Sequence, residues 1–309
     1  MGTVIAAAAI AAPQPEYTST SSVQLAGQAA HECLTRAGRS VDAIGVLINV
    51  GIYREHNTME PAMAALVQKE AGIHLDYFQR TGTNATFSFD LMNGACGVLN
   101  AVQVSEALLA SGSTDRVLVT AADVHPSGSA GKDPHYPYSD LGAALLLERS
   151  AEPTVGFGPV RHRGAPGASG GEGYLDMSAM GTSGRSNITV RSDQGGEDWV
   201  RQLLDLTVAL VTDYADDEGL DLSRTLLVCN RPVPGFPDEL ARRVQIPRAS
   251  VVATEAPLAM DGAPHTAAPV LGYLQAVEQG LLEGFDQMMF VCCGTGPTVA
   301  CVSYRPKEQ

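Results

Sequence analysis

The apolar and polar positions of this chain follow two different periods. Segments with an apolar residue every three or four positions predict amphipathic helices, and short unbroken apolar runs bounded by turn residues predict buried strands. The helices expected in this way cover residues 22–38, 97–110 and 198–219, and a further one begins near His265. The expected strands lie within 1–19, 42–51, 85–92, 115–123, 141–148, 224–230, 249–256, 286–294 and 297–304.

These elements repeat in the same order in both halves of the chain: helix, strand, short strand, helix, strand, strand. Strands that are apolar throughout, rather than at alternate positions, are typical of sheets that helices cover on both faces. The sequence therefore predicts a layered α/β fold built from two related halves, residues 1–155 and 198–309. The Gly- and Ser-rich segment 156–197 connects them, and because long loops in compact chains are usually functional or mobile, we expect it to line a pocket.

Composition narrows the classes of partner. The 309 residues include 34 acidic and 20 basic side chains, a formal net charge of −14. A field of that sign repels nucleic acid and anionic membranes, so we expect neither as a partner. The sequence has no apolar run of the roughly 18 residues that a membrane span needs, and no basic region precedes the opening apolar segment. We therefore expect a cytoplasmic protein.

The six cysteines also point to the cytoplasm. Their spacing matches no zinc pattern, and most of them lie inside apolar runs. We expect reduced thiols, with no bound metal and no cofactor.

Cys96 occupies a distinctive position, in the stretch FDLMNGACG where a strand gives way to a helix. Unpaired N–H groups at a helix start stabilise negative charge, and such positions can lower a cysteine pKa to about 3.5–7.5. The repeat gives His265 the equivalent place in the second half, and a pseudo-twofold axis would bring the two helix starts together. A buried cysteine acting as a small hydrophobe, and a structural histidine, are the ordinary alternatives.

Several blocks, in this order, carry a resemblance to a known family: FDLMNGACG, SGSTDRVLVTAADV, SDLGAALLLE, NRPVPGFPDELARRV, DGAPHTAAPV and CCGTGPTVA. From about Thr20 to Tyr304 the chain resembles the thiolase superfamily, on the branch of ketoacyl-ACP synthase III enzymes. The resemblance implies a five-layered αβαβα fold and a homodimer. It also implies a cysteine that takes an acyl group from a thioester carried by acyl carrier protein or coenzyme A.

The resemblance implies catalytic roles for Cys96, Asn230 and His265. Synthases of this type have histidine and asparagine where this chain has Asn230 and His265, so the two are exchanged, as in thiolases and in acyl-transferring relatives. An imidazole beside the cysteine is suited to proton abstraction from an alcohol, an amine or an α-carbon. Asn230 would hydrogen-bond the carbonyl oxygen or a water, unless it is a core or capping residue.

Further roles are implied at the walls of the site. The backbone N–H groups of Cys96 and Gly296 would form an oxyanion hole. Cys292 lies where thiolases keep a second, basic cysteine, with a core cysteine as the equal alternative. Glu60 resembles a glutamate that some condensing enzymes supply as a base to the neighbouring subunit, and a carboxylate at a helix N-terminus is the alternative.

Two further features concern the acyl carrier. Arg242 and Arg243 match a region that docks acyl carrier protein in relatives, and an ordinary solvated helix face is the alternative. Synthase III chains bind coenzyme A through a tryptophan and arginines that precede the first helix. The single tryptophan of this sequence is Trp199, which lies far from that region. The sequence therefore does not decide whether the acyl donor is carried by acyl carrier protein or by coenzyme A.

These features lead to the hypothesis that the protein is an acyltransferase of specialised metabolism. An acyl-cysteine would form from a thioester and pass its acyl group to an oxygen or nitrogen nucleophile. Two alternatives remain: carbon–carbon condensation, decarboxylative or thiolase-like, and a non-catalytic subunit that shapes the pocket of a heterodimer.

Overall fold

The structure analysed is a computed structural model. It describes residues 2–13, 21–57, 60–74, 85–126, 136–152, 154–167, 169–175, 178, 188–191, 196–257 and 260–307.

The first half of the chain forms a five-stranded mixed sheet in the order β1-β5-β4-β2-β3. Its strands are β1 (Thr3–Ala11), β2 (Val46–Asn49), β3 (Phe87–Asp90), β4 (Arg116–Asp123) and β5 (Leu141–Arg149). Strand β2 runs parallel to β3 and β4, and β5 runs antiparallel to β4 and β1. The opening segment is therefore a strand, as its apolar run predicts.

The second half repeats this sheet, in the order β11-β10-β12-β13-β6. Its strands are β10 (Thr225–Asn230), β11 (Val251–Thr254), β12 (Gln287–Cys293), β13 (Thr298–Arg305) and β6 (Gly156–Phe157), with β7 (Arg161–Gly164) also paired to β13. Strand β10 is parallel to β11 and β12, and β13 is antiparallel to β12 and β6. The connecting segment therefore contributes two short strands to the C-terminal sheet, and β8 (Glu172–Leu175) and β9 (Ile188–Arg191) form a separate pair.

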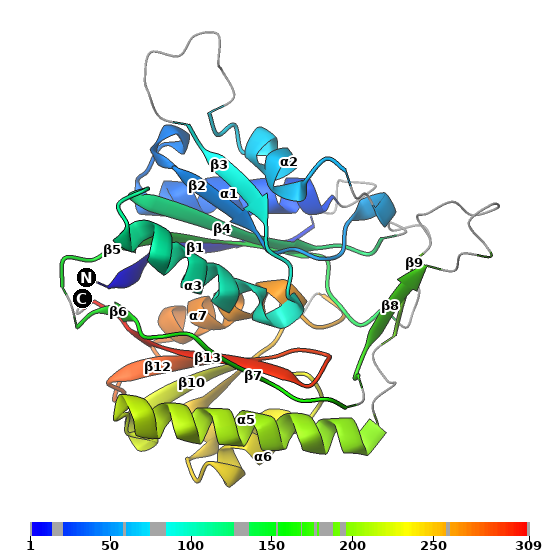
Figure 1. Ribbon diagram of the computed structural model, residues 1–309, viewed down its shortest axis with the longest axis vertical. Coiled ribbons are helices and arrows are strands. Elements are labelled where there is room, and N and C mark those ends of the chain that lie inside the picture. The colour runs from blue at the N-terminus through cyan, green and yellow to red at the C-terminus, as the bar shows by residue number, and fades with distance from the viewer. Residues whose placement is uncertain are drawn as a thin grey trace.

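Helices separate and cover the two sheets, as Figure 1 shows. Helices α3 (Gly97–Ala110) and α7 (Ala268–Glu278) lie between the sheets, α1 (Ser22–Ala37) and α2 (Met63–Glu70) cover the outer face of the first, and α5 (Gly196–Glu218) and α6 (Phe236–Arg243) cover the outer face of the second. Short 3-10 turns complete the described chain: η1 (Val41–Ala43), η2 (Glu55–Asn57), η3 (Gly94–Cys96), η6 (Leu222–Arg224), η7 (Arg248–Ser250) and η8 (His265–Ala267). The five αβαβα layers confirm the predicted fold class.

Alternate side chains of each strand enter different layers, which explains why the strands are apolar throughout. In β4, Leu118 packs in the outer cluster under α1, whereas Val117 and Val119 pack in the central cluster with α3. In β12, Met289 faces the α5 side and Phe290 faces the centre. Because helices bury both faces of each sheet, the strands lack the alternating polar residues that are typical of a sheet with one face in solvent.

The first helix carries clear start and stop signals. The Ser21 side chain accepts a hydrogen bond from Gln24 N, and Gly38 ends α1 in the left-handed conformation with φ 61°. Glu55 reinforces the start, because its carboxylate accepts hydrogen bonds from the Ser21 hydroxyl and the Ser22 N–H. These contacts fix the loop after β2 against α1.

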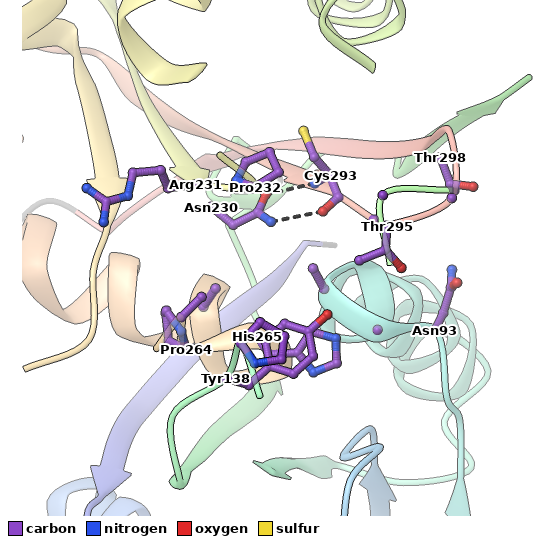
Figure 2. Close-up of a pocket in the computed structure, with 18 of the residues that line it drawn as sticks. Asn93, Tyr138, Asn230, Arg231, Pro232, Pro264, His265, Cys293, Thr295 and Thr298 are labelled. Carbon is purple, nitrogen blue, oxygen red and sulfur yellow. Dashed lines mark hydrogen bonds between the residues drawn. The ribbon is translucent and has the colours of Figure 1, made fainter. Parts of the chain in front are cut away.

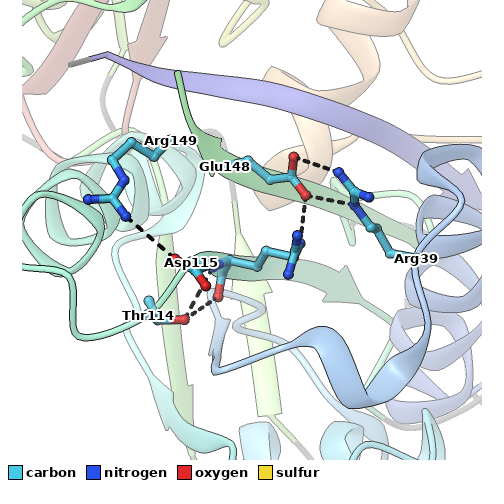
Figure 3. Close-up of polar contacts among 6 residues, drawn as sticks. Arg39, Thr114, Asp115, Glu148 and Arg149 are labelled. Carbon is cyan, nitrogen blue, oxygen red and sulfur yellow. Dashed lines mark hydrogen bonds and ion pairs between the residues drawn. The ribbon is translucent and has the colours of Figure 1, made fainter. Parts of the chain in front are cut away.

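An ion-pair network joins helix and sheet where α1 ends (Figure 3). Glu148 on β5 accepts hydrogen bonds from Arg39 Nε at 2.9 Å and from Arg116 Nε at 2.7 Å. Burial opposes the charge of Glu148, but the bonds from Arg39 and Arg116 outweigh it and hold the pKa of its carboxyl below its usual value. This network contributes to stability rather than to chemistry.

Candidate active site

A cavity of about 350 Å³ lies where the two halves meet. Its walls come from the starts of the two central helices, from the loops after β10 and β12, and from the first turn of α5. Figure 2 shows Tyr138 and His265 on one side of this cavity and Asn230 with Cys293 on the other. The site is therefore built at the seam of the repeat.

Cys96 occupies the predicted place at the start of the α3 helix. It ends the 3-10 turn η3 and serves as the N-cap residue of α3. Its neighbours Gly94 and Ala95 line the cavity, whereas Cys96 itself is 1% exposed and is not among the described lining residues. The thiol donates a hydrogen bond to the Cys292 carbonyl oxygen at 3.4 Å.

The expected lowering of the Cys96 pKa is wrong for this structure. Burial raises the pKa of the thiol to about 12, because the surrounding core cannot solvate a thiolate. Backbone hydrogen bonds at Gly294 and Ala300 favour the thiolate but do not compensate for burial. At neutral pH Cys96 is therefore a thiol, and a base must take its proton before it can attack.

His265 lies at the start of the opposite central helix, in the turn η8 that precedes α7. The turns η3 and η8 contact each other, so the pseudo-twofold relation brings the two helix starts together. A β-carbon placed on Gly94 would lie 3.4 Å from His265 Nε2, which puts that nitrogen beside the turn that carries Cys96.

A buried carboxylate orients the imidazole. His265 Nδ1 lies 3.0 Å from Asp123 Oδ2, and the Thr266 N–H and hydroxyl also donate to that oxygen. The other oxygen accepts from Ile52 N at 2.9 Å and Tyr53 N at 2.8 Å. Burial alone would raise the pKa of Asp123, but His265 and these hydrogen bonds hold it below its usual value.

The arrangement fixes which nitrogen carries the proton. A carboxylate only accepts hydrogen bonds, so Nδ1 of His265 carries a proton, and in the neutral imidazole the lone pair is on Nε2, which lies beside the turn of Gly94. Tyr138 stacks on the imidazole with ring centroids 3.9 Å apart and an interplanar angle of 21°. His265 also has φ 37°, a left-handed conformation that costs on the order of 1–3 kcal/mol in a residue other than glycine. Such strain persists where surrounding contacts define a functional side chain.

Asn230 ends β10 and pairs with the backbone of β12. Its Nδ2 donates to the Cys293 carbonyl at 2.9 Å, and its Oδ1 accepts from Cys293 N at 2.8 Å (Figure 2). The side chain thus has the structural function expected of a core asparagine while it also lines the cavity. One amide N–H lies beyond this pairing and is available to a ligand.

One of the two N–H groups predicted for the oxyanion hole is engaged within the protein. The Cys96 N–H donates to the Asn93 carbonyl at 3.0 Å, because Cys96 closes the 3-10 turn, so this group is already engaged. Gly296 lines the cavity, and within the described chain its N–H makes no hydrogen bond. A tight turn positions it, in which Gly294 N donates to the Thr298 carbonyl at 2.8 Å.

Cys292 has the position of a core residue. Its side chain is 2% exposed and packs in the same cluster as Cys96, and burial raises the pKa of its thiol well above the ordinary value. The cavity wall is formed by its neighbour Cys293. Cys292 therefore has the surroundings of a core cysteine, and its role as a second base stays a prediction.

Glu60 is exposed and lies outside the described lining of the cavity. It does not cap a helix either, because α2 begins at Met63 and Asp90 accepts hydrogen bonds from Met63 N and Ala64 N, both at 2.9 Å. Glu60 therefore lies just ahead of α2 and makes no capping hydrogen bond to it within the described chain. A role in a neighbouring subunit stays a prediction.

Arg242 and Arg243 lie at the end of α6 and pair with acids on the same surface. Arg242 Nη2 lies 2.5 Å from Glu239 Oε1, and Arg243 bonds Glu239 and Asp205. These pairs offset the basic charge locally, which favours a solvated face over a docking patch.

The residues of this site that the sequence analysis did not assign include Asp123, Tyr138 and Arg231. Asp123 had a signal in the sequence, because it is an acid that ends an apolar strand. Tyr138 and Arg231 had none, since their position depends on how loops pack.

No group of three or more His, Cys, Asp or Glu side chains that could hold a metal occurs within the described chain. All six cysteines are free and buried. Within the same residues, no helix is both long and apolar enough to cross a membrane.

No protein-family model and no curated protein matches this sequence.

Solved structures do match its fold. The 3-oxoacyl-ACP synthase III of Aquifex aeolicus aligns with a TM-score of 0.74 at 17% identity, covering 98% of this chain and 100% of that one. The corresponding enzyme of Pseudomonas aeruginosa gives a TM-score of 0.75 at 18% identity, covering 100% and 99%. OleA of Xanthomonas campestris, solved with lauric acid and lauroyl-CoA, gives 0.71 at 15% identity and 99% coverage of both chains. The chain therefore has the thiolase fold, in the arrangement seen in structures of 3-oxoacyl-ACP synthase III.

Proposed function

We propose that this protein is an acyltransferase that loads an acyl group from a thioester onto Cys96 and passes it to an oxygen or nitrogen nucleophile. The observation that carries the proposal is the Asp123–His265 pair, which holds an oriented imidazole beside the turn bearing Cys96. A nucleophile, a base on the neighbouring turn and an acid that orients the base are parts that acyl-transfer catalysis uses.

In the first step, His265 Nε2 takes the proton of the Cys96 thiol, and the sulfur attacks the thioester carbonyl. The tetrahedral intermediate collapses, the carrier thiolate leaves, and the imidazolium returns the proton to it. Asp123 stabilises the imidazolium through Nδ1 without taking its proton. The oxyanion is stabilised by the N–H of Gly296 and the remaining N–H of Asn230.

In the second step, the acceptor O–H or N–H gives its proton to Nε2 as it attacks the acyl-cysteine. Collapse of the second intermediate expels the Cys96 thiolate, which regains a proton from His265. The same base thus serves both halves of the reaction.

Carbon–carbon condensation is the second candidate, and the similarity of the fold to 3-oxoacyl-ACP synthase III structures favours it. Decarboxylative condensation needs two neutral donors on the enolate oxygen. Here a carboxylate holds the histidine for proton abstraction, so the one side-chain donor that remains is the Asn230 amide N–H that is not bonded to Cys293. This arrangement favours transfer to a heteroatom over decarboxylative condensation. The proposal places that transfer in specialised metabolism.

The donor would be an acyl thioester on acyl carrier protein or coenzyme A. A homodimer remains part of the proposal, because the exposed β3 edge carries Phe87, which is 64% exposed, and Met92 lies just beyond it at 53%. A large exposed apolar pair at an unpaired strand edge is typical of an interface.

The test is intact-protein mass spectrometry after incubation with acyl thioesters, including malonyl, on both carriers. An adduct that maps to Cys96 and disappears in Cys96→Ala supports the proposal. Cys33→Ala is the matched control, because Cys33 is also buried with its pKa raised to about 12, but it lies on α1, in the outer cluster and not in the cavity lining. A malonyl adduct that stays intact favours transfer, whereas its conversion to acetyl favours condensation. If no donor labels the protein, the pocket-shaping subunit of a heterodimer becomes the better explanation.

A further inference from the structure

Tyr138 lines the cavity beside the proposed base and carries a polar group that no described residue uses. Its ring stacks on the imidazole of His265 with centroids 3.9 Å apart. Within the described chain its hydroxyl makes no hydrogen bond, and it is not among the buried polar atoms that lack a partner, so it is accessible. Figure 2 shows the ring with this hydroxyl directed into the space between the two walls. The Tyr138 O–H is therefore available to a ligand in the cavity.

The backbone around Tyr138 is fixed to the loop that leads into His265. Ser139 N donates to the Ala263 carbonyl at 2.9 Å, and Ser139 Oγ donates to the Gly262 carbonyl at 2.8 Å. A β-carbon on Gly262 would lie 2.6 Å from the Tyr138 carbonyl carbon, so only glycine lets the two segments pack this closely. These contacts hold the phenol and the imidazole in one arrangement, so the hydroxyl keeps a fixed place relative to the base.

In the proposed mechanism the acceptor lies on this side of the cavity. The donors proposed for the oxyanion, Gly296 and Asn230, come from the turn after β12 and the end of β10, which form the opposite wall. The base that takes the acceptor proton is His265, on the wall that carries Tyr138. An acceptor whose proton reaches His265 Nε2 therefore lies beside the phenol as well.

The phenol proton distinguishes between two kinds of acceptor. Burial raises the pKa of Tyr138, so the phenol keeps its proton and acts as a donor. An alcohol oxygen has two lone pairs, so one can attack the acyl carbonyl carbon while the other accepts the hydrogen bond from the phenol. The nitrogen of a neutral amine has one lone pair, which the attack uses. An amine therefore leaves the phenol proton without an acceptor, which is unfavourable.

We propose that Tyr138 determines acceptor specificity: its hydroxyl donates a hydrogen bond to the attacking oxygen of an alcohol and so favours alcohols over amines. As the C–O bond forms, the alcohol proton passes to His265 Nε2. The bond from the acyl carbon to Cys96 Sγ then breaks, the thiolate regains that proton from the imidazolium, and an ester is released. Tyr138 keeps its own proton throughout. This inference rests on the proposed function for the existence of the acyl-cysteine.

The test is a competition between two acceptors of the same carbon skeleton. Wild-type protein acylated on Cys96 is separated from the thioester donor and mixed with equal concentrations of trifluoroethanol and trifluoroethylamine, whose fluorines keep the amine largely neutral near neutral pH. Mass spectrometry of the small products gives the ratio of ester to amide. Because free amines attack thioesters faster than alcohols do, this ratio is compared between protein variants.

The decisive variant is Tyr138→Phe, which keeps the ring on His265 and removes the hydroxyl. The ester-to-amide ratio should fall by about ten-fold, the contribution of one hydrogen bond to the alcohol transition state. Acylation of Cys96 should stay within about two-fold of wild type, because the hydroxyl acts only in the second step, and this rate also shows that the variant is folded.

Tyr136→Phe is the matched control. Tyr136 packs edge-on against Tyr138 with ring centroids 5.6 Å apart, but its hydroxyl donates to the Val124 carbonyl at 3.3 Å and it is not in the cavity lining. Its removal should leave the ester-to-amide ratio unchanged. An equal fall in both variants would assign the effect to packing of the aromatic rings and would overturn the inference.

Two further results would overturn it: a ratio that Tyr138→Phe leaves unchanged, or a wild-type acyl-enzyme that forms no ester from trifluoroethanol. Failure of the proposed function has a different signature. In that case no thioester acylates Cys96 in the wild-type protein, and the inference about Tyr138 is lost with it.

Discussion

His265 Nδ1 lies 3.0 Å from Asp123 Oδ2, across 142 residues of sequence. The pair joins the last residue of β4 in the first half to the helix start of the second half. It therefore holds the imidazole to the half of the molecule that carries Cys96. The predictions below depend on this link and on the groups around it.

Asp123→Asn should reduce onward acyl transfer by about a hundred- to ten-thousand-fold, because the amide no longer stabilises the imidazolium. Acylation of Cys96 should still be detectable over long incubation, and His265→Ala should behave in the same way. The measurement is single-turnover transfer from preformed acyl-enzyme to an acceptor. Normal transfer in His265→Ala would remove His265 from the mechanism, and normal transfer in Asp123→Asn would remove the role assigned to Asp123.

Alkylation of Cys96 by iodoacetamide should accelerate continuously from about pH 6 to pH 10. Burial raises the pKa of Cys96 to about 12, and only the thiolate reacts, so each unit of pH increases the reactive fraction. A thiolate already formed at neutral pH would instead give a plateau. Peptide mapping separates this signal from Cys33, whose pKa is raised to about 12 by the same cause.

Gly94→Ala should abolish acyl transfer. Gly94 has φ 50°, and its β-carbon would lie 3.4 Å from His265 Nε2, so the methyl group would stand against the nitrogen that the mechanism uses as its base. The backbone cost is about 1–2 kcal/mol. Gly112→Ala is the matched control, because Gly112 has φ 74° with no atom within 4 Å of the added carbon. It should lose similar thermal stability and keep its activity; equal loss of activity in both variants would assign the effect to strain alone.

Asn230→Ala should lower the free energy of unfolding by about 1–3 kcal/mol, because the Cys293 N–H and carbonyl lose their partner. Asn230→His should not increase transfer to an alcohol. Chemical denaturation and the single-turnover assay measure the two effects. A faster Asn230→His enzyme would contradict the assignment of proton abstraction to His265.

Glu148→Gln should flatten the acid side of the stability profile. The pKa of Glu148 is lowered in the fold, so its contribution is present above the unfolded value of about 4.3 and is lost as pH falls through the folded value. Wild type should therefore lose more stability than the variant between about pH 5 and pH 3. At neutral pH the variant should be less stable by about 1 kcal/mol or less, since the pairs are partly exposed. Parallel curves would show that the network contributes nothing.

The sequence by itself determined the order of elements and the repeat. The helix expected at 97–110 is α3 (Gly97–Ala110), because apolar periodicity and the glycine-rich turn are local signals. The repeat also placed Cys96 and His265 at equivalent helix starts, which the fold brings into contact. Short pieces were less visible: α2, β6 and β7 carry too few residues for a period to show.

Only the tertiary structure decided the chemistry of individual groups. The helix start favours a thiolate at Cys96, yet burial outweighs it, and burial depends on layers that are distant in sequence. The Cys96 N–H is engaged by Asn93, and Asn230 is engaged by Cys293, because of turn and strand geometry that no spacing predicts. Periodicity reports which way a side chain faces. The pKa and the hydrogen bonds of that side chain depend on the residues around it. At this site those residues come from both halves of the chain.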